Sequence, residues 1–467
     1  MNYIYLLLIF ELILLIWSFL LNGQDIMAPS AIMCAMFVLS TVFAIMNIEA
    51  WGIDYSLEAV LLLSTGLLVF ILAETFFRIV FVKKKKEIKQ GDTQFYEIPV
   101  QMWMIVFLIV FNLAVSFWYY IEIKNIVGNG QGNVFELFAS YRRMNVSNLA
   151  NSKSESISTL LNQFLKVVKA SGYISVYMAL NKFFCKGKKG QTLGLLIVAA
   201  TSLIPSIMIA SRAEFLKFFS AILIEYYILW HQKHGWDRVF SWKYIKIGLI
   251  ILLVGIPVFY NSLHLMGRGS TEMTMMEYAS EYVGSSIQLF DLYIKEPVPC
   301  NSFGEETLVG IRKVLGILGI QSASKSSNLE FRLLGEDKSN VYTFFRRPLH
   351  DYGLVGMYIF TILVAFLFAW LYYCKIKNRA GGKKTDCWVL IYGYLYYWMV
   401  SSSILQYSQS YISVGAALII AAIIIGYLIM TCAKLKIKVT RKITGRKIRL
   451  RYSGSAFGGG EKNNGGF

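Results

Sequence analysis

Charged residues are scarce in this chain of 467 residues: they make up 16% of it, against roughly 25% in a soluble domain. Proline is scarce as well, with 7 residues, so long uninterrupted helices are permitted. The six cysteines are scattered without a CxxC pair, which argues against a disulfide framework and against a zinc site. The N-terminus, Met-Asn-Tyr, lacks the basic segment of a cleaved signal peptide, so we expect the first apolar span to be retained.

Long apolar segments fill most of the chain, and 56% of the residues are hydrophobic. A helix needs about 20 apolar residues to cross a bilayer, and only helices or closed barrels satisfy their backbone groups there. These segments do not alternate polar and apolar residues as barrel strands do. We therefore expect an all-α, polytopic transmembrane protein with about eleven spans, or ten to twelve. The expected spans are 3–21, 28–47, 57–81, 99–121, 158–180, 192–211, 214–231, 244–263, 351–373, 386–405 and 412–432.

Lysine and arginine gather in alternate loops of this pattern, while the loops 48–56 and 406–411 contain neither. Basic loops stay in the cytoplasm, so we expect the N-terminus outside and the C-terminus inside. Much of the net charge of +18 is then a topology signal, and nucleic acid is not an expected partner. The basic segments lie at 83–89, 182–189, 233–243, 375–384 and 434–451.

Two long loops interrupt the spans and fall on the outer side, at 122–157 and 264–350. Loops of this length are usually functional or disordered, and these two contain amphipathic helical patterns. We expect residues 1–452 to form one integral membrane domain. The last stretch, 453–467, is rich in Gly, Asn and Ser, and we expect it to be disordered. The expected outer helices are 134–149, 273–294 and 306–320.

Arginines are numerous in these outer segments, and a guanidinium group recognises phosphate through two parallel hydrogen bonds. The pattern favours a site for an anionic, membrane-borne substrate. The alternative for Arg212 and Glu214 is a turn with solvated charges, and for the other arginines it is snorkelling at the interface. The candidate binding residues are Arg142, Arg143, Arg212, Glu214, Arg268, Arg346 and Arg347.

His350 and Asp351 are the best outer candidates for acid–base chemistry, because an imidazole or a carboxylate can accept a proton from an attacking hydroxyl. Asp351 has a structural alternative as a cap or dipole partner at the start of the ninth span.

The segment 340–356 reads Asn-Val-Tyr-Thr-Phe-Phe-Arg-Arg-Pro-Leu-His-Asp-Tyr-Gly-Leu-Val-Gly. It resembles a segment of the oligosaccharide repeat unit polymerases, the Wzy-type O-antigen and capsule polysaccharide polymerases. Tyr-Val-Gly-Ser-Ser at 282–286, Phe303-Gly304 and the Ser211–Glu214 turn are also similar to that family. The number of spans and the large outer loops agree along most of the chain.

The resemblance implies a lipid-dependent, multi-spanning glycosyltransferase in the bacterial cytoplasmic membrane. Such an enzyme joins oligosaccharide units carried on undecaprenyl diphosphate at the outer face. It needs no metal or other cofactor, and a chain-length regulator protein is a partner. The arginines would hold the diphosphate, and Asn340 and Tyr342 would belong to the substrate site.

One departure from the family concerns the base. Related enzymes open this segment with a His-Asn pair, whereas this chain has Ser339-Asn340. A base would then come from elsewhere, and His350 and Asp351 are substitutes by chemistry. Two other functions stay open: a flippase for lipid-linked oligosaccharides, and an O-antigen ligase.

Overall fold

The computed structural model describes residues 2–81, 95–128, 133–151, 157–209, 211–236, 274–320, 329–335, 337–377, 379 and 381–432. Several predictions fall outside the described residues. They are the eighth span at 244–263, Arg268, the basic segment 83–89, most of the basic segment 233–243 and the tail after residue 432.

Long helices dominate, and each of the other ten predicted spans overlaps at least one of them. Within the described part of the chain, six helical segments are long and apolar enough to cross a membrane: α1, α4, α5, α8 with α9, α14 with η1, and α17. The chain is therefore an all-α membrane protein, and the count of eleven spans stays a prediction. The long helices and their immediate extensions are α1 (Ile4–Leu21), α2 (Pro29–Ile45), α4 (Leu57–Phe81), α5 (Met102–Val127), α7 (Thr159–Cys185), α8 (Lys189–Ser202), α9 (Ile204–Met208), α10 (Arg212–His234), α14 (Arg346–Ala369), the π-helix η1 (Trp370–Ile376), α15 (Lys383–Val400) and α17 (Val414–Cys432).

The segments between the spans form shorter elements. Helices α6 (Val134–Asn151), α12 (Met275–Lys295) and α13 (Val309–Ile317) confirm the three helices predicted in the long loops. Two short strands, β1 (Arg332–Leu334) and β2 (Asp337–Ser339), form an antiparallel hairpin that was not predicted. The remaining short helices are α3 (Ile48–Trp51) and α16 (Ser408–Tyr411).

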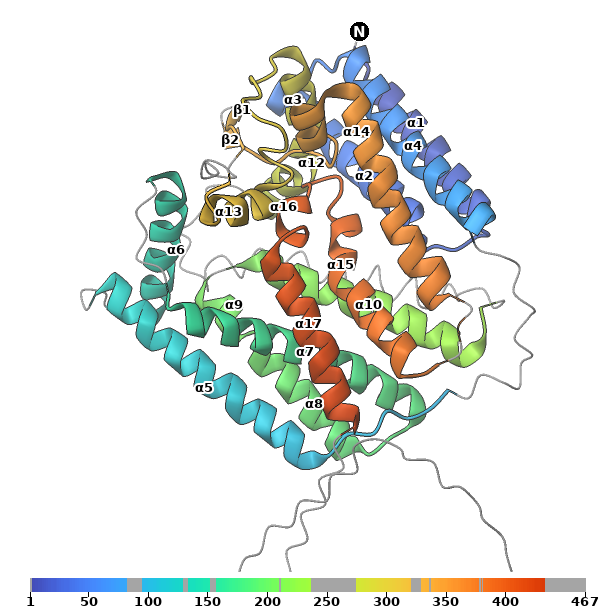
Figure 1. Ribbon diagram of the computed structural model, residues 1–467. Helices are drawn as coiled ribbons and strands as arrows, with labels where there is room; N and C mark the ends of the chain where they lie inside the picture. The colour runs from blue at the N-terminus through green and yellow to red at the C-terminus, as the bar shows by residue number, and fades with distance from the viewer. Residues whose placement is uncertain are drawn as a thin grey trace, which may run out of the picture.

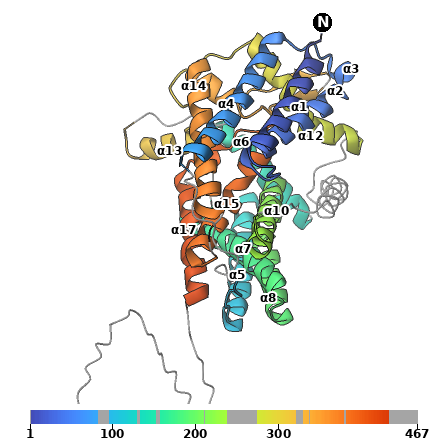
Figure 2. The same ribbon diagram turned by 90° about the vertical axis from the view of Figure 1, so that its right-hand side faces the viewer.

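The long helices fall into two groups, which Figure 1 shows one above the other. Helices α1, α2, α4 and α14 pack in the upper group, and α5, α7, α8 and α17 pack in the lower one, while α10 and α15 contact each other between them. Figure 2 shows the same two groups from the side.

Figure 1 also separates the ends of the long helices. The short elements α3, α6, α12, α13, α16 and the hairpin lie together at the upper left, and the helix ends next to the basic segments point to the lower right. This arrangement places the two long loops on the same side, which we call the loop end. That this end faces the outside stays a prediction.

Apolar side chains point outward from the long helices, and polar ones point inward. Ile13, Phe76 and Phe107 are more than half exposed, whereas Glu11 and Asn112 are fully buried. Such a surface suits lipid rather than water, because hydrocarbon solvates apolar groups and gives polar groups no partner.

Candidate functional site

Glu214 binds two lysines from different helices at the loop end of the molecule. Its Oε2 atom lies 2.5 Å from Lys169 Nζ of α7, and its Oε1 atom lies 2.9 Å from Lys217 Nζ of α10. Glu214 and Lys217 are three residues apart on one helix, a spacing that brings side chains together. The carboxylate also lies in the first turn of α10, where the helix dipole favours a negative charge.

Two arginines lie beside this ion pair. Arg212 is the first residue of α10 and is buried, with its guanidinium carbon 5.2 Å from the ring centroid of Tyr278 on α12. Burial lowers the pKa of Arg142 on α6, and the positive charge of Arg212 lowers it further. Since that second effect requires proximity, the two guanidinium groups lie near each other although 70 residues separate them in sequence.

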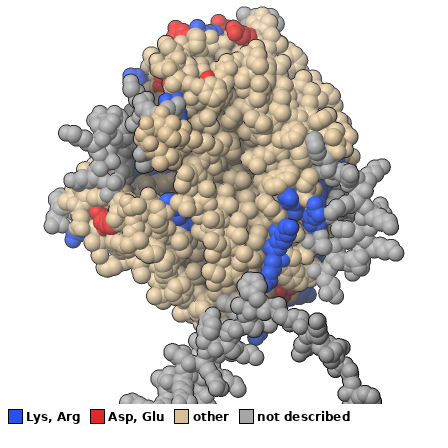
Figure 3. Space-filling view, in the orientation of Figure 1, with Lys and Arg blue, Asp and Glu red and all other residues tan. Residues whose placement is uncertain are grey.

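We call Arg142, Lys169, Arg212, Glu214 and Lys217 the cationic cluster. The cationic cluster brings four basic side chains together with one carboxylate, that of Glu214. The side chains are not sealed from solvent, since that of Lys169 is 29% exposed. Figure 3 shows basic side chains in a hollow on the left of the molecule, beside the region of α6 and α13. The start of α10 adds the partial positive charge of a helix N-terminus, so this place suits an anion.

Aromatic rings border the cationic cluster. The ammonium group of Lys217 lies 5.2 Å from the ring centroid of Tyr407, and the Tyr407 ring lies 5.2 Å from that of Tyr397. Such rings attract cations and limit the access of water. Contacts with the rings of Tyr278 and Tyr407 therefore help to fix the positions of Arg212 and Lys217.

Arg346 belongs to a second cluster, at the start of α14. Its guanidinium group is fully buried and binds Glu306 and Glu330, with Nη2 2.5 Å from Glu330 Oε2. It also lies over the rings of Tyr293, at 4.4 Å, and Tyr342, at 5.2 Å. Burial raises the pKa of Glu330, but the hydrogen bond and the charge from Arg346 outweigh burial and leave that pKa lowered. Two carboxylates thus neutralise Arg346.

Arg347 is buried as well and donates to the backbone oxygen of Glu306 at 3.0 Å. Both arginines lie in the first turn of α14, which Gly353 separates from the rest of the helix with φ of 66° and ψ of −170°. Only glycine adopts this conformation readily. A phosphate group could reach Arg346 only by displacing its glutamates.

Asp351 accepts hydrogen bonds from the loop in front of α13. The backbone N–H of Thr307 donates to Oδ2 at 2.7 Å, the Thr307 hydroxyl donates at 2.6 Å, and the N–H of Glu306 donates to Oδ1 at 3.1 Å. The carboxylate therefore caps a neighbouring segment, whereas the structural alternative from sequence was a cap for its own helix.

His350 is enclosed between two side chains. Its Nε2 atom lies 2.8 Å from Glu305 Oε1, and its Nδ1 atom lies 3.3 Å from the Tyr293 hydroxyl. The imidazole is 2% exposed, and Glu305 in front of it is 23% exposed. Burial raises the pKa of Glu305, but the hydrogen bonds from His350, Asn301 and Ser302 and the charge of His350 together outweigh burial and leave that pKa lowered. A substrate would meet the carboxylate of Glu305 before the imidazole.

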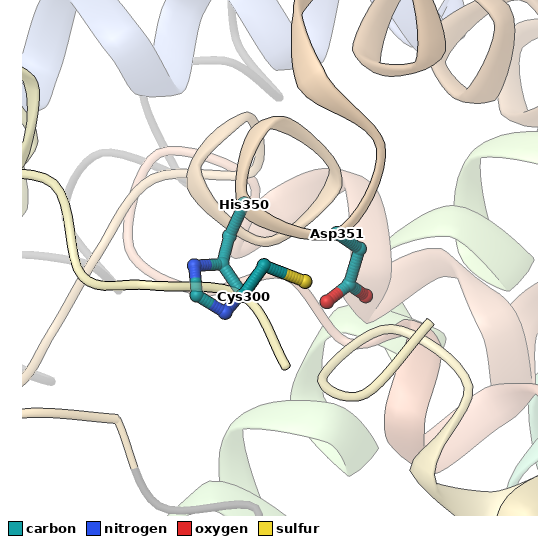
Figure 4. Close-up of side chains that lie close together, drawn as sticks. All are labelled: Cys300, His350 and Asp351. Atoms are coloured by element: carbon teal, nitrogen blue, oxygen red, sulfur yellow. The ribbon is translucent and has the colours of Figure 1, made fainter. Parts of the chain in front are cut away.

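Cys300, His350 and Asp351 place one sulfur, one nitrogen and one oxygen within 4.8 Å of one another (Figure 4). These donor types suit a zinc ion. However, the imidazole and the carboxylate are already held by Glu305 and Thr307. The fit is therefore poor, and we derive no chemistry from a metal at this place.

Replacing Asp351 by alanine should destabilise the part of the loop end that α12, α13, the hairpin and the start of α14 form. The change leaves the backbone N–H groups of Glu306 and Thr307 without their acceptor, and each unsatisfied buried group costs about 1–3 kcal/mol. The expected result is a lower melting temperature for the purified protein in detergent. An unchanged melting temperature would contradict the capping role and leave Asp351 free for catalysis.

The structure thus divides the predicted site residues between two places. Tyr278 at the cationic cluster and Tyr293 at Arg346 are fifteen residues apart on α12, or about 22 Å along the helix. Arg143 is exposed and bonds to Ser140 at 3.1 Å, and Asn340 is half-buried. Arg142, Arg212 and Glu214 lie in the cationic cluster, and Tyr342, Arg346, Arg347, His350 and Asp351 lie in the second cluster.

Several residues of both clusters were not predicted as site residues. Lys169 and Lys217 belong to the first cluster, and Glu305, Glu306 and Glu330 belong to the second. A charge inside an apolar span, as with Lys169, was the available signal, because such a charge is costly unless it has a function.

Comparisons of this chain with protein-family models, with curated proteins and with solved structures give no match. The functional argument therefore depends on the residues of the chain itself, on their geometry and on the resemblance of the segment 340–356.

Proposed function

We propose that this chain polymerises undecaprenyl-diphosphate-linked oligosaccharide units into a surface polysaccharide, O-antigen or capsule. The reaction takes place at the outer face of the bacterial cytoplasmic membrane, with the N-terminus outside and the C-terminus in the cytoplasm. The cationic cluster carries the proposal, because it gathers four basic side chains from three helices around one carboxylate at the loop end. The resemblance of the segment 340–356 supplies the reaction type.

The depth of the cationic cluster favours a ligand carried by a lipid. Lys169 is ten residues from the first residue of α7, or about 15 Å along that helix. Basic side chains among apolar helices cost free energy even when they share one carboxylate, and an arriving anion lowers that cost. A diphosphate presents two phosphoryl groups to the four basic side chains, and a phospholipid headgroup presents one.

The proposed step is a glycosyl transfer. A hydroxyl oxygen of the incoming unit forms a bond with the anomeric carbon of the growing glycan, and the bond from that carbon to the carrier diphosphate breaks. The diphosphate takes the electron pair, and the hydroxyl loses its proton to a base. Positive groups that are fixed before the reaction stabilise the leaving diphosphate without further reorganisation.

The candidates for the base that accepts the hydroxyl proton are chosen by the chemistry of their side chains, not by their distance from the cationic cluster. His350 and Asp351 stay the predicted candidates, with Glu305 as the exposed neighbour of His350. About 22 Å along α12 separates these residues from the cationic cluster, which favours a structural role at the loop end for them instead. A chain-length regulator is the protein partner that this function implies.

Deletion of the gene tests the proposal at the level of the cell. Gel analysis of the surface polysaccharide should show single repeat units in place of a long ladder. An unchanged ladder would contradict a polymerase. Long glycan retained on its carrier would instead identify a ligase, and repeat units accumulating on the cytoplasmic side would identify a flippase.

A further inference from the structure

A second basic site lies at the opposite end of the helices, where the basic segments are. A hollow of about 410 Å³ opens there between the segment before α5 and the C-terminal ends of α7 and α10. We call it the lysine pocket, and its lining residues are Phe95, Glu97, Phe184, Cys185, Lys186 and Lys233. Its volume is within the range of about 300–1,000 Å³ in which small ligands bind.

The charges of the lysine pocket are held by the fold. Lys233 donates to the backbone oxygen of Phe184 at 2.5 Å, and its ammonium group lies 5.9 Å from the centroid of the Phe184 ring. Glu97 is balanced by Lys182, whose Nζ atom lies 2.6 Å from Oε1 and whose side chain is 1% exposed. With Glu97 neutralised, Lys186 and Lys233 give the pocket a net positive charge.

The surroundings of the lysine pocket combine this charge with an apolar surface. Phe183 precedes Phe184 at the end of α7, and its side chain is 66% exposed. Lys186 follows as the C-cap of α7 in a left-handed conformation, with φ of 55°, and it is exposed. An apolar ring next to exposed lysines at a helix end is the pattern expected at the level of lipid headgroups.

We propose that the lysine pocket binds the headgroup of an anionic phospholipid, with its phosphate between Lys186 and Lys233. The acyl chains would then run along the apolar surface that begins at Phe183. This site is separate from the cationic cluster and does not depend on the proposed polymerase activity. Lysines that only set the membrane topology would not need to line a pocket. Lys188 and Lys189 provide the comparison, because they are exposed close to Lys186 in the chain but do not line the lysine pocket.

Native mass spectrometry of the purified full chain tests the lysine pocket. The protein is titrated with phosphatidylglycerol or with phosphatidylcholine, and the bound lipids are counted. We expect a phosphatidylglycerol adduct that phosphatidylcholine does not give. The variant Lys186→Gln/Lys233→Gln should weaken that adduct about thirty-fold, from the usual contribution of each lysine near an anionic lipid. The control variant Lys188→Gln/Lys189→Gln should bind as the unchanged protein does.

Three results would overturn the proposal. Equal amounts of bound phosphatidylglycerol and phosphatidylcholine would show that the pocket does not distinguish an anionic headgroup from a neutral one. Equal weakening in the control variant would show a diffuse effect of surface charge. Binding of soluble glycerol phosphate with the affinity of the lipid would show a phosphate site that needs no membrane. A melting temperature equal to that of the unchanged protein establishes that each variant is folded.

Discussion

Replacing Arg212 by alanine is expected to abolish long polysaccharide chains while the protein still folds and reaches the membrane. Arg212 lies over Tyr278 in the cationic cluster, where a leaving diphosphate would need its charge. Removing one fixed donor of this kind from an active site typically lowers turnover by about 10²–10³. The measurement is the length of surface polysaccharide on a gel in a deletion strain that carries the variant, with the amount of protein in the membrane determined in parallel.

Two neighbouring arginines of α6 provide a matched comparison for this prediction. Arg142 lies near Arg212, whereas Arg143 is exposed and bonds to Ser140. Arg142→Ala should shorten the chains as Arg212→Ala does, and Arg143→Ala should leave the ladder close to normal. If Arg143→Ala were as defective as Arg142→Ala, the position of the cationic cluster would not explain the loss.

Replacing Arg346 by alanine is expected to destabilise the protein itself. The change leaves Glu306 and Glu330 facing each other in a mostly buried place without the guanidinium group that neutralises both. Breaking a buried ion pair by removing one partner costs about 3–5 kcal/mol. We expect a lower melting temperature in detergent and less protein in the membrane, with any loss of polymer following from these.

The triple variant Arg346→Met/Glu306→Gln/Glu330→Gln separates this account from a direct role in binding. It removes the charge of Arg346 together with those of its two partners, so neither glutamate is left charged without the guanidinium group, and part of the lost stability should return. A normal melting temperature for Arg346→Ala, combined with a loss of polymer, would contradict the structural role. Arg346 would then belong to the substrate site as the resemblance implies.

The contrast between Arg212 and Arg346 could not be read from the sequence. Both lie next to a helix start at the loop end, and both fit the same general expectation of phosphate binding. In the structure Arg346 binds two carboxylates, and Arg212 lies over the ring of Tyr278. Glu306 and Glu330 lie 40 and 16 residues from Arg346 in the chain, so only the fold shows that its charge is already neutralised.

The spans were predictable because each depends on about 20 consecutive apolar residues, a local property. The amphipathic helices α6, α12 and α13 were predictable for the same reason, since their periodicity lies within one segment. The hairpin of β1 and β2 has three residues in each strand, too few for a recognisable alternation. The π-helix η1 continues α14 directly, with no proline or glycine between them to mark the change of helix type.

The role of Asp351 shows why site residues are harder to predict than spans. Its place near the start of a helix suggested a cap for that helix, and its chemistry suggested a base. The structure gives it hydrogen bonds from Thr307, 44 residues earlier in the chain. Partners at such a separation depend on tertiary packing, which no local pattern encodes.

The most direct test of the central proposal is the binding of a polyprenyl diphosphate to the purified protein in nanodiscs, compared with the corresponding monophosphate. We predict that the diphosphate binds at least about tenfold more tightly, since a second phosphoryl group engages the cationic cluster. The double variant Arg142→Ala/Arg212→Ala should lose this preference while keeping its melting temperature. Equal affinity for the two lipids, or an unchanged preference in the double variant, would contradict a diphosphate site at the cationic cluster.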